Sequence, residues 1–148
     1  MSDPTSPRSV FESLLQRFSD GKWTDLADFY AEDAVVELPF APPSPTRLQG
    51  REAVRAHFAA AAGLPLKIRA SNVVVHDTGD PEVVIAEFDY DGQVTTTGHP
   101  LRVSNIQVLR VRNGQIVSSR DYHNHLAIAA ALGQLPEPLS PLAHQGPA

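Results

Sequence analysis

The fold is decided by two β-type runs that one turn joins: VTTTGHPLRVSNIQVLRVR (residues 94–112) and QIVSSRDYH (residues 115–123). The turn is Asn113-Gly114, and an Asn-Gly pair between runs rich in β-branched residues is a strong hairpin signal. The two runs therefore predict antiparallel strands, with a kink in the first at Gly98-His99-Pro100.

One face of the second run carries groups that could exchange a proton. Period-two alternation places Ser119, Asp121 and His123 on this face, followed by His125 if the strand continues that far. A carboxylate and an imidazole two residues apart on one face can share a proton. If the face lines an apolar cavity, both pKa values are perturbed and acid–base chemistry becomes possible.

Two more β-type runs precede this pair, at residues 66–76 and 82–90. Turn-forming residues follow each of them, at residues 77–81 and at Asp91-Gly92. Consecutive hairpins predict an antiparallel sheet.

The first part of the chain predicts helices. Ser9 and Glu12 fit a capping box at the start of an amphipathic helix that ends near Asp20-Gly21. A second helix follows, with Trp23, Leu26, Phe29 and Tyr30 on its apolar side. Next come a short strand at residues 34–38 and a proline-rich loop at residues 39–50. The last two predicted helices are residues 51–62, capped by Gly63, and residues 126–132.

Helices followed by a long antiparallel meander predict an α+β fold. The 148 residues are enough for one domain with a sizeable core. We expect this domain to cover residues 8–133, between a flexible N-terminus at residues 1–7 and a flexible tail at residues 134–148. Three short helices can cover only part of the sheet.

The composition excludes several classes of function. The net charge is −5 and no cluster of Lys and Arg exists, so neither nucleic acid nor a membrane surface is an expected partner. The absence of cysteine excludes disulfides, thiolate catalysis and Cys-based metal sites.

The polar start of the chain does not resemble a signal peptide, and no apolar run reaches the ~20 residues of a membrane span. A cytoplasmic location is therefore expected.

About 100 residues, from Phe29 to Leu132, resemble the nuclear-transport-factor-2-like superfamily, and within it the ketosteroid isomerases and SnoaL-like polyketide cyclases. The motifs that carry the resemblance are FYAEDAVVE (29–37), GREAV (50–54), EFDYDG (87–92), TGHP (97–100), RNGQI (112–116) and RDY (120–122). The resemblance implies a cone, in which a strongly bent antiparallel sheet wraps around N-terminal helices. It also implies an internal pocket for a hydrophobic small molecule, no cofactor and a homodimer.

The residues that ketosteroid isomerases use for catalysis are replaced in this sequence. The general-base position before Pro39 holds Leu38, and the tyrosine position of the first helix holds Leu14. The nearest candidates for the protonated aspartate of the third long strand are Asn105 and Gln107. The resemblance therefore does not imply steroid isomerisation by that machinery.

Asp121 is the carboxylate to which the resemblance points instead. It matches the catalytic aspartate in the Arg-Asp-Tyr motif of limonene-epoxide-hydrolase-like members, and it suits the carboxylate attributed to SnoaL-like cyclases. Those hydrolases also need an Arg-x-Asp pair on an earlier strand, where this chain has Phe88 and Tyr90. By the same comparison Ser119, Asp121 and His123 face the cavity.

We therefore predict Asp121 and His123 as catalytic residues. The expected substrate-binding residues are Tyr30, Leu38, Phe58, Phe88, Tyr90, Asn105, Gln107 and Ser119. Amides within an apolar strand face suggest hydrogen bonds to a ligand carbonyl or an oxyanion, although the same face could instead meet solvent or a partner. Asp121 could equally be a structural carboxylate, and His123 a polar plug in the cavity wall.

No metal site is expected. Asp121, His123 and His125 alternate on one run, but residues i and i+4 of a strand lie about 13 Å apart. His57 shares the inward face of its helix with Val54 and Phe58, which indicates a core or rim histidine.

Three functions remain open from the sequence. The first is a cofactor-independent acid–base enzyme, an isomerase, cyclase or dehydratase for a small hydrophobic carbonyl compound. Asp121 would take the proton, and His123 with Asn105 or Gln107 would stabilise the enolate. The second is an epoxide-hydrolase-like enzyme in which Asp121 activates water, and the third is a non-catalytic ligand-binding protein.

Overall fold

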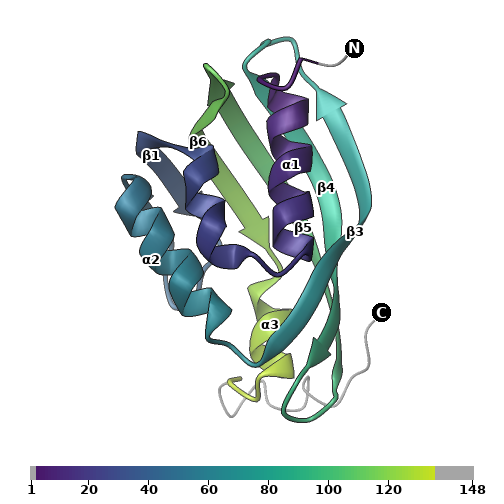
Figure 1. Ribbon diagram of the computed structural model, residues 1–148. Coiled ribbons are helices and arrows are strands. Elements are labelled where there is room, and N and C mark those ends of the chain that lie inside the picture. Colours follow the sequence, from purple (N-terminus) through teal and green to yellow (C-terminus); the bar gives the residue numbers. More distant parts are fainter. Residues whose placement is uncertain (1–2, 136–148) are drawn as a thin grey trace.

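The six strands form one curved sheet in the order β2-β1-β6-β5-β4-β3 (Figure 1). The computed structural model describes residues 3–135. Almost all of the predicted C-terminal tail therefore lies outside the described residues. The strands are β1 (Tyr30–Leu38), β2 (Thr46–Gln49), β3 (Leu66–Asp77), β4 (Val83–Val94), β5 (Pro100–Arg112) and β6 (Gln115–His123).

Helices cover the inner side of the bend. In Figure 1, α1 (Pro7–Ser19) and α2 (Arg51–Ala62) lie in front of the sheet. A 3-10 helix, η1 (Trp23–Phe29), connects α1 to β1, and α3 (His125–Ala131) lies at the lower end of the sheet. Together these elements confirm the predicted α+β cone, with a strongly bent sheet around N-terminal helices and a short C-terminal helix.

The first helix begins earlier than predicted. Its N-cap is Ser6, whose Oγ accepts a hydrogen bond from the backbone N–H of Ser9, and Pro7 occupies the first helical turn. Proline suits this position because the N–H that it lacks would be unpaired there anyway. The capping box assigned to Ser9 and Glu12 is therefore wrong, because Ser9 already lies inside the helix.

The sheet is not wholly antiparallel. β3, β4, β5 and β6 form the predicted consecutive hairpins. β1, however, runs parallel to β6, with Val36 opposite Ser119. The parallel pair brings the first strand of the chain beside the last one, and so joins the helical half of the sequence to the hairpins.

Three further local predictions are wrong. β1 begins at Tyr30 and not at residue 34, so Tyr30 belongs to this strand and not to the second helix. The segment at residues 39–50 is not all loop, because β2 returns along β1 with Val36 opposite Leu48. Asp91-Gly92 is not a turn, because it lies within β4. Gly92 is needed for another reason: a Cβ there would collide with the carbonyl oxygen of Lys67 on β3.

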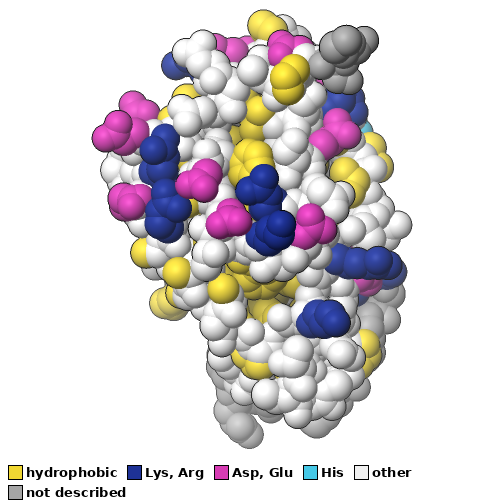
Figure 2. Space-filling model, in the orientation of Figure 1, with side chains coloured by type: hydrophobic (Ala, Val, Ile, Leu, Met, Phe, Trp, Pro, Cys, Tyr) yellow, Lys and Arg dark blue, Asp and Glu magenta, His cyan; other side chains and the backbone are white. Residues whose placement is uncertain are grey.

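The two faces of the sheet differ in chemistry. The inner face joins the helices in one apolar core, which includes Phe11, Leu26 and Leu109. The outer face carries charged groups, for example Arg110, whose guanidinium lies 2.9 Å from Glu82 and 3.0 Å from Asp80. Figure 2 shows acidic and basic side chains intermingled over the helices. Among the helices within residues 3–135, none has the length and apolar character needed to cross a membrane.

Candidate active site

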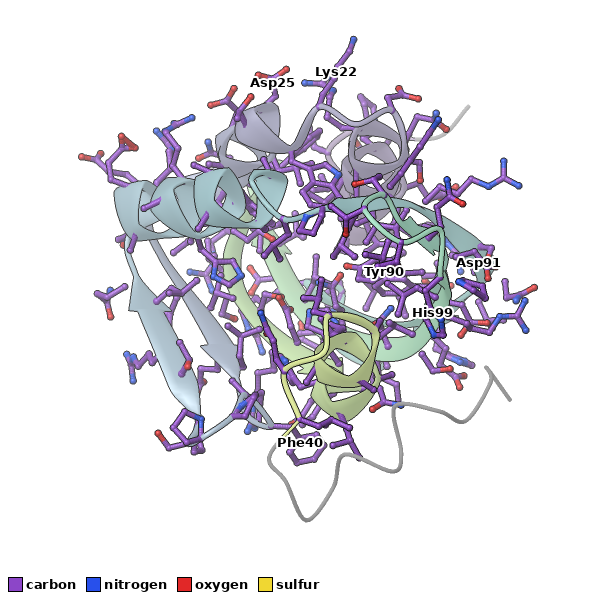
Figure 3. All side chains as sticks on the ribbon, turned by 90° about the horizontal axis from the view of Figure 1, so that it is seen from below. Lys22, Asp25, Phe40, Tyr90, Asp91 and His99 are labelled. Carbon is purple, nitrogen blue, oxygen red and sulfur yellow. The ribbon has the colours of Figure 1, made fainter. Side chains whose placement is uncertain are left out.

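A cavity of about 270 Å³ lies between the inner face of the sheet, the N-terminal helices and α3. Figure 3 looks from below, with α3 across this end of the cone and Tyr90 on the inner side of the sheet. The walls are mostly apolar. Residues of every helix and strand contribute, including Leu14, Trp23, Leu38, Leu48, Phe58, Ile68, Val103 and Ile128. Such a cavity suits a small, mainly hydrophobic ligand.

Asp121 places a carboxyl group in this apolar wall. It lies on β6 opposite Gln107 of β5, and only 7% of its surface is exposed. Burial raises the pKa of Asp121 to about 6, although hydrogen bonds from Ser119 and Gln107 act in the opposite direction. Among the described residues, no Arg or Lys forms an ion pair with it. Asp121 can therefore both accept and return a proton near neutral pH.

His123 is held in one tautomer by Asn105. The Asn105 Nδ2 donates to the backbone carbonyls of Val103 (3.1 Å) and Phe88 (3.4 Å). This leaves Asn105 Oδ1 to face His123 Nδ1 at 2.7 Å. Because a carbonyl oxygen only accepts, His123 Nδ1 carries the hydrogen and Nε2 keeps its lone pair. Burial lowers the pKa of His123 to about 4, so the ring is neutral.

This geometry changes the roles that the sequence suggested. Neither His123 nor Asn105 can donate to an enolate oxygen, because the N–H groups of both are already used within the wall. His123 lines the cavity as a hydrogen-bond acceptor instead. Asn105 positions His123 from behind and does not line this cavity.

Two tyrosines of the cavity wall have hydroxyl groups that can donate hydrogen bonds to a ligand, which His123 and Asn105 cannot do. Tyr30, at the start of β1, and Tyr90, on β4, both line the cavity. Burial raises the pKa of each phenol, and the nearby charge of Asp121 raises it further. Both hydroxyls therefore stay protonated and can donate to an oxygen that gains negative charge.

The predicted substrate-binding residues fall into two groups. The cavity is lined by Tyr30, Leu38, Phe58, Tyr90 and Gln107. Phe88, Asn105 and Ser119 do not line it: Phe88 packs between Phe11 and Tyr90 in the core, Asn105 orients His123, and Ser119 donates to Asp121. Alternation along a strand identifies the correct face, but not how deeply each side chain lies behind the surface.

Two histidines of the cavity wall were missing from the predicted site. β6 ends at His123, so His125 enters α3 and its ring lies 5.6 Å from that of His123. In the sequence, Asn124 is the residue that indicates this change from strand to helix, because its side chain caps α3 by accepting a hydrogen bond from the backbone N–H of Ala127. His57 reaches the cavity from α2, and burial lowers its pKa. Within residues 3–135, no group of three or more His, Cys, Asp or Glu side chains is arranged to hold a metal ion.

Comparison with known proteins places this architecture in a family. The SnoaL-like domain family matches residues 11–119. An uncharacterised PhzA/B-like protein of Pseudomonas aeruginosa is 38% identical over 129 residues, which are 85% of this chain and 89% of that protein. A solved Bacillus subtilis structure that carries the provisional name of an isomerase is 30% identical, with a TM-score of 0.81 over 91% of this chain and 98% of its own.

The fold agrees with a more distant structure as well. A Catenulispora acidiphila protein with a ketosteroid isomerase-like fold, 20% identical, superposes with a TM-score of 0.71 over 88% of this chain and 95% of its own. The family match covers most of the described residues, and the cone and its cavity agree with it. The chain therefore belongs to the SnoaL-like domain family, within the nuclear-transport-factor-2-like superfamily.

Proposed function

We propose that this protein is a cofactor-independent acid–base enzyme of the isomerase, cyclase or dehydratase type, acting on a small hydrophobic carbonyl compound in the cone cavity. One observation carries the proposal. Asp121 is a buried carboxyl group without a cationic partner among the described residues, and it opens into an apolar cavity with a pKa of about 6. Membership of the SnoaL-like family and the 30% identical isomerase-named structure support this class of function.

The proposed chemistry is a proton transfer next to a carbonyl group. The Asp121 carboxylate removes a proton from the carbon adjacent to the carbonyl, and the electron pair of that C–H bond moves onto the carbonyl oxygen. Tyr30 or Tyr90 donates a hydrogen bond to the resulting enolate oxygen. Asp121 then returns the proton to another carbon in an isomerisation, or to a departing β-hydroxyl group, which leaves as water. In a cyclisation the enolate carbon attacks a second carbonyl carbon of the same molecule, the π electron pair of that carbonyl moves onto its oxygen, and this oxygen takes the proton from Asp121.

The two alternative functions predict other features. A cavity filled by side chains, or an ion pair that held Asp121, would favour a non-catalytic protein, and the described residues show neither. A protein that only binds its ligand would share the open cavity, and the exchange experiment below separates it from an enzyme. An epoxide hydrolase of the limonene type needs an Arg-x-Asp pair where this chain has Phe88 and Tyr90, and Phe88 is buried in the core. The appearance of isotope from labelled water in a diol product would nevertheless identify hydrolysis.

The test is hydrogen exchange at the carbon next to a carbonyl. A bicyclic ketone such as 1-indanone is incubated with the protein in deuterated buffer, and loss of the α-proton signal is followed by NMR. We expect exchange with the natural protein and a loss of roughly 10²–10⁴-fold in the Asp121→Asn variant. The matched control is Glu87→Gln, which removes an exposed carboxylate from the outer face. A loss under about threefold in Asp121→Asn would remove Asp121 from the role of general base.

A cytoplasmic location and a homodimer, both expected from the sequence, are part of the proposal. Cell fractionation tests the location. Light scattering coupled to gel filtration tests the oligomeric state.

A further inference from the structure

His57 lies where the cavity meets the solvent. The helix α2 turns one stripe of side chains toward the cavity, at the three- and four-residue spacing of a helix face: Val54, His57, Phe58 and Ala61. His57 is the polar member of this stripe. Of the described residues that line the cavity, only His57 and Leu64 are exposed to solvent. We call these two residues the mouth of the cavity.

The imidazole ring of His57 has no partner that would occupy it. The rings of His76 and His123 each lie within hydrogen-bond distance of another side chain. Among the described residues, no such contact and no ion pair involves the ring of His57. A neutral imidazole accepts a proton at one nitrogen and can release one from the other. The ring is therefore free to pass a proton between the cavity and the solvent.

Asp121 has little access to solvent of its own. Only 7% of its surface is exposed, and a ligand in the cavity would cover this remainder. Its charge nevertheless reaches His57: burial lowers the pKa of His57, and the charge of Asp121 acts in the opposite direction. No ion pair joins the two side chains directly. A proton that moves between them would cross through a water molecule.

The two groups also bind a proton with similar strength. Burial raises the pKa of Asp121 from 3.8 to about 6. Burial lowers the pKa of His57 from its ordinary value of 6.5. The same cause thus brings the two pKa values together, and a proton can move between the groups in either direction with little change in free energy.

The other titratable groups of the cavity wall are less suited to this transfer. Tyr30 and Tyr90 keep their protons, because burial raises the pKa of each phenol. Burial lowers the pKa of His123 to about 4, and its Nδ1–H is occupied by Asn105. The Nε2 atom of His125 is buried, so this nitrogen cannot exchange a proton with the solvent.

We propose that His57 carries protons between Asp121 and the solvent during the proposed reaction. The Asp121 carboxyl group, which has taken the α-proton, gives it through a water molecule to the free nitrogen of neutral His57. The imidazolium ring that forms releases a proton to the solvent. The reverse steps return a solvent proton to the Asp121 carboxylate, which gives it to the enolate carbon. This inference rests on the proposed function and adds a second proton-transfer residue to it.

The test follows the exchange of the α-protons of 1-indanone in deuterated buffer by NMR, in His57→Ala and His57→Phe. Without His57, Asp121 returns the proton that it removed, so the α-proton signal should persist. We expect a loss of roughly 10²-fold in both variants, the lower end of the contribution of a positioned proton-transfer group. The matched control is His76→Ala, which removes an exposed imidazole from the outer face and should exchange as the natural protein does.

Rescue by imidazole separates proton transfer from a structural role. Added imidazole fits the space that His57→Ala leaves at the mouth, and it should restore exchange in this variant once the rate without protein is subtracted. It should not restore exchange in His57→Phe, whose ring fills that space, nor in Asp121→Asn, which lacks the base. A side chain that only supported the fold would not be replaced by a free imidazole molecule.

Three results would overturn the inference. They are unchanged exchange in both His57 variants, a loss in His57→Ala that imidazole does not repair, and a loss confined to His125→Gln, which would place the path at α3. Each variant is compared with itself, with and without imidazole, and His57→Phe decides if His57→Ala fails to fold. Failure of the proposed function is distinguishable: without exchange in the natural protein, or with normal exchange in Asp121→Asn, both proposals fall, whereas normal exchange in the His57 variants removes this one alone.

Discussion

Replacing Asp121 with asparagine should change how the free energy of unfolding depends on pH. Burial raises the pKa of this carboxyl from its ordinary value of 3.8 to about 6, a difference of about 2 units. Each unit corresponds to about 1.36 kcal/mol of preference for the protonated form. Because the carboxyl group is buried, solvent does not screen this preference, and the free energy of unfolding is expected to change by about 3 kcal/mol.

The sign follows from proton binding. The folded protein holds the Asp121 proton more tightly than the unfolded chain does, so protonation stabilises the fold. This contribution is complete below pH 3.8 and is lost as the pH rises through about 6. Over this pH interval the free energy of unfolding of the natural protein should therefore fall by about 3 kcal/mol relative to that of Asp121→Asn, because asparagine has no charge to bury.

Urea unfolding at a series of pH values measures this difference. The single tryptophan, Trp23, stacks on Phe18 in the cavity wall and reports unfolding by its fluorescence. Other titrating groups are common to both proteins and cancel when the two curves are subtracted. Ser119→Ala provides a second variant: it removes a donor that lowers the pKa of Asp121, so its transition should move to higher pH. Parallel stability curves for the natural protein and Asp121→Asn would refute the reasoning.

Three further predictions test the site and the sheet. The ¹⁵N shifts of His123 should report a neutral ring protonated at Nδ1, and a ring protonated at Nε2 would contradict the assigned orientation. Tyr30→Phe or Tyr90→Phe should slow ketone exchange by about 10²–10³-fold if its hydroxyl binds the enolate, and unchanged rates in both variants would exclude the two donors. Gly92→Ala should lower the free energy of unfolding by about 1–3 kcal/mol or more because its Cβ meets the β3 backbone. Gly79→Ala, in open space, should change it by no more than about 0.5 kcal/mol, and equal effects would contradict the strand spacing.

The parts of the fold that could be predicted are those with local signals. The bounds of β6, Gln115–His123, and of α2, Arg51–Ala62, agree with the sequence interpretation because Asn113-Gly114 and Gly63 mark their ends. The parallel pairing of β1 with β6 joins segments about 80 residues apart, and no local pattern encodes such a pairing. β2 lies in a proline-rich segment, where composition favoured a loop over a short strand.

The candidate site also has a part that the sequence predicts and a part that it does not. Alternation along each strand was enough to group Asp121 with His123 and Gln107 with Asn105, but it left open whether the second pair faced the cavity, solvent or a partner. The register of β5 against β6 places Gln107 opposite Asp121. The tautomer of His123 depends on where the Asn105 amide finds its acceptors, and those are backbone carbonyls of two different strands. The sequence specifies neither contact, so it suggested a donor where the structure has an acceptor.

The cost of ionising Asp121 helps to decide between a structural and a catalytic role. A carboxylate kept for stability is expected to have a cation or several N–H donors that lower its pKa, as Glu82 has in Arg110 and Arg112. Asp121 has the opposite balance, because burial outweighs its hydrogen bonds from Ser119 and Gln107. At neutral pH it is mostly ionised and therefore destabilises the fold relative to an uncharged side chain of similar size. A group that costs stability at the pH where it would act as a base, and that opens into a cavity, is better explained by the chemistry it can perform.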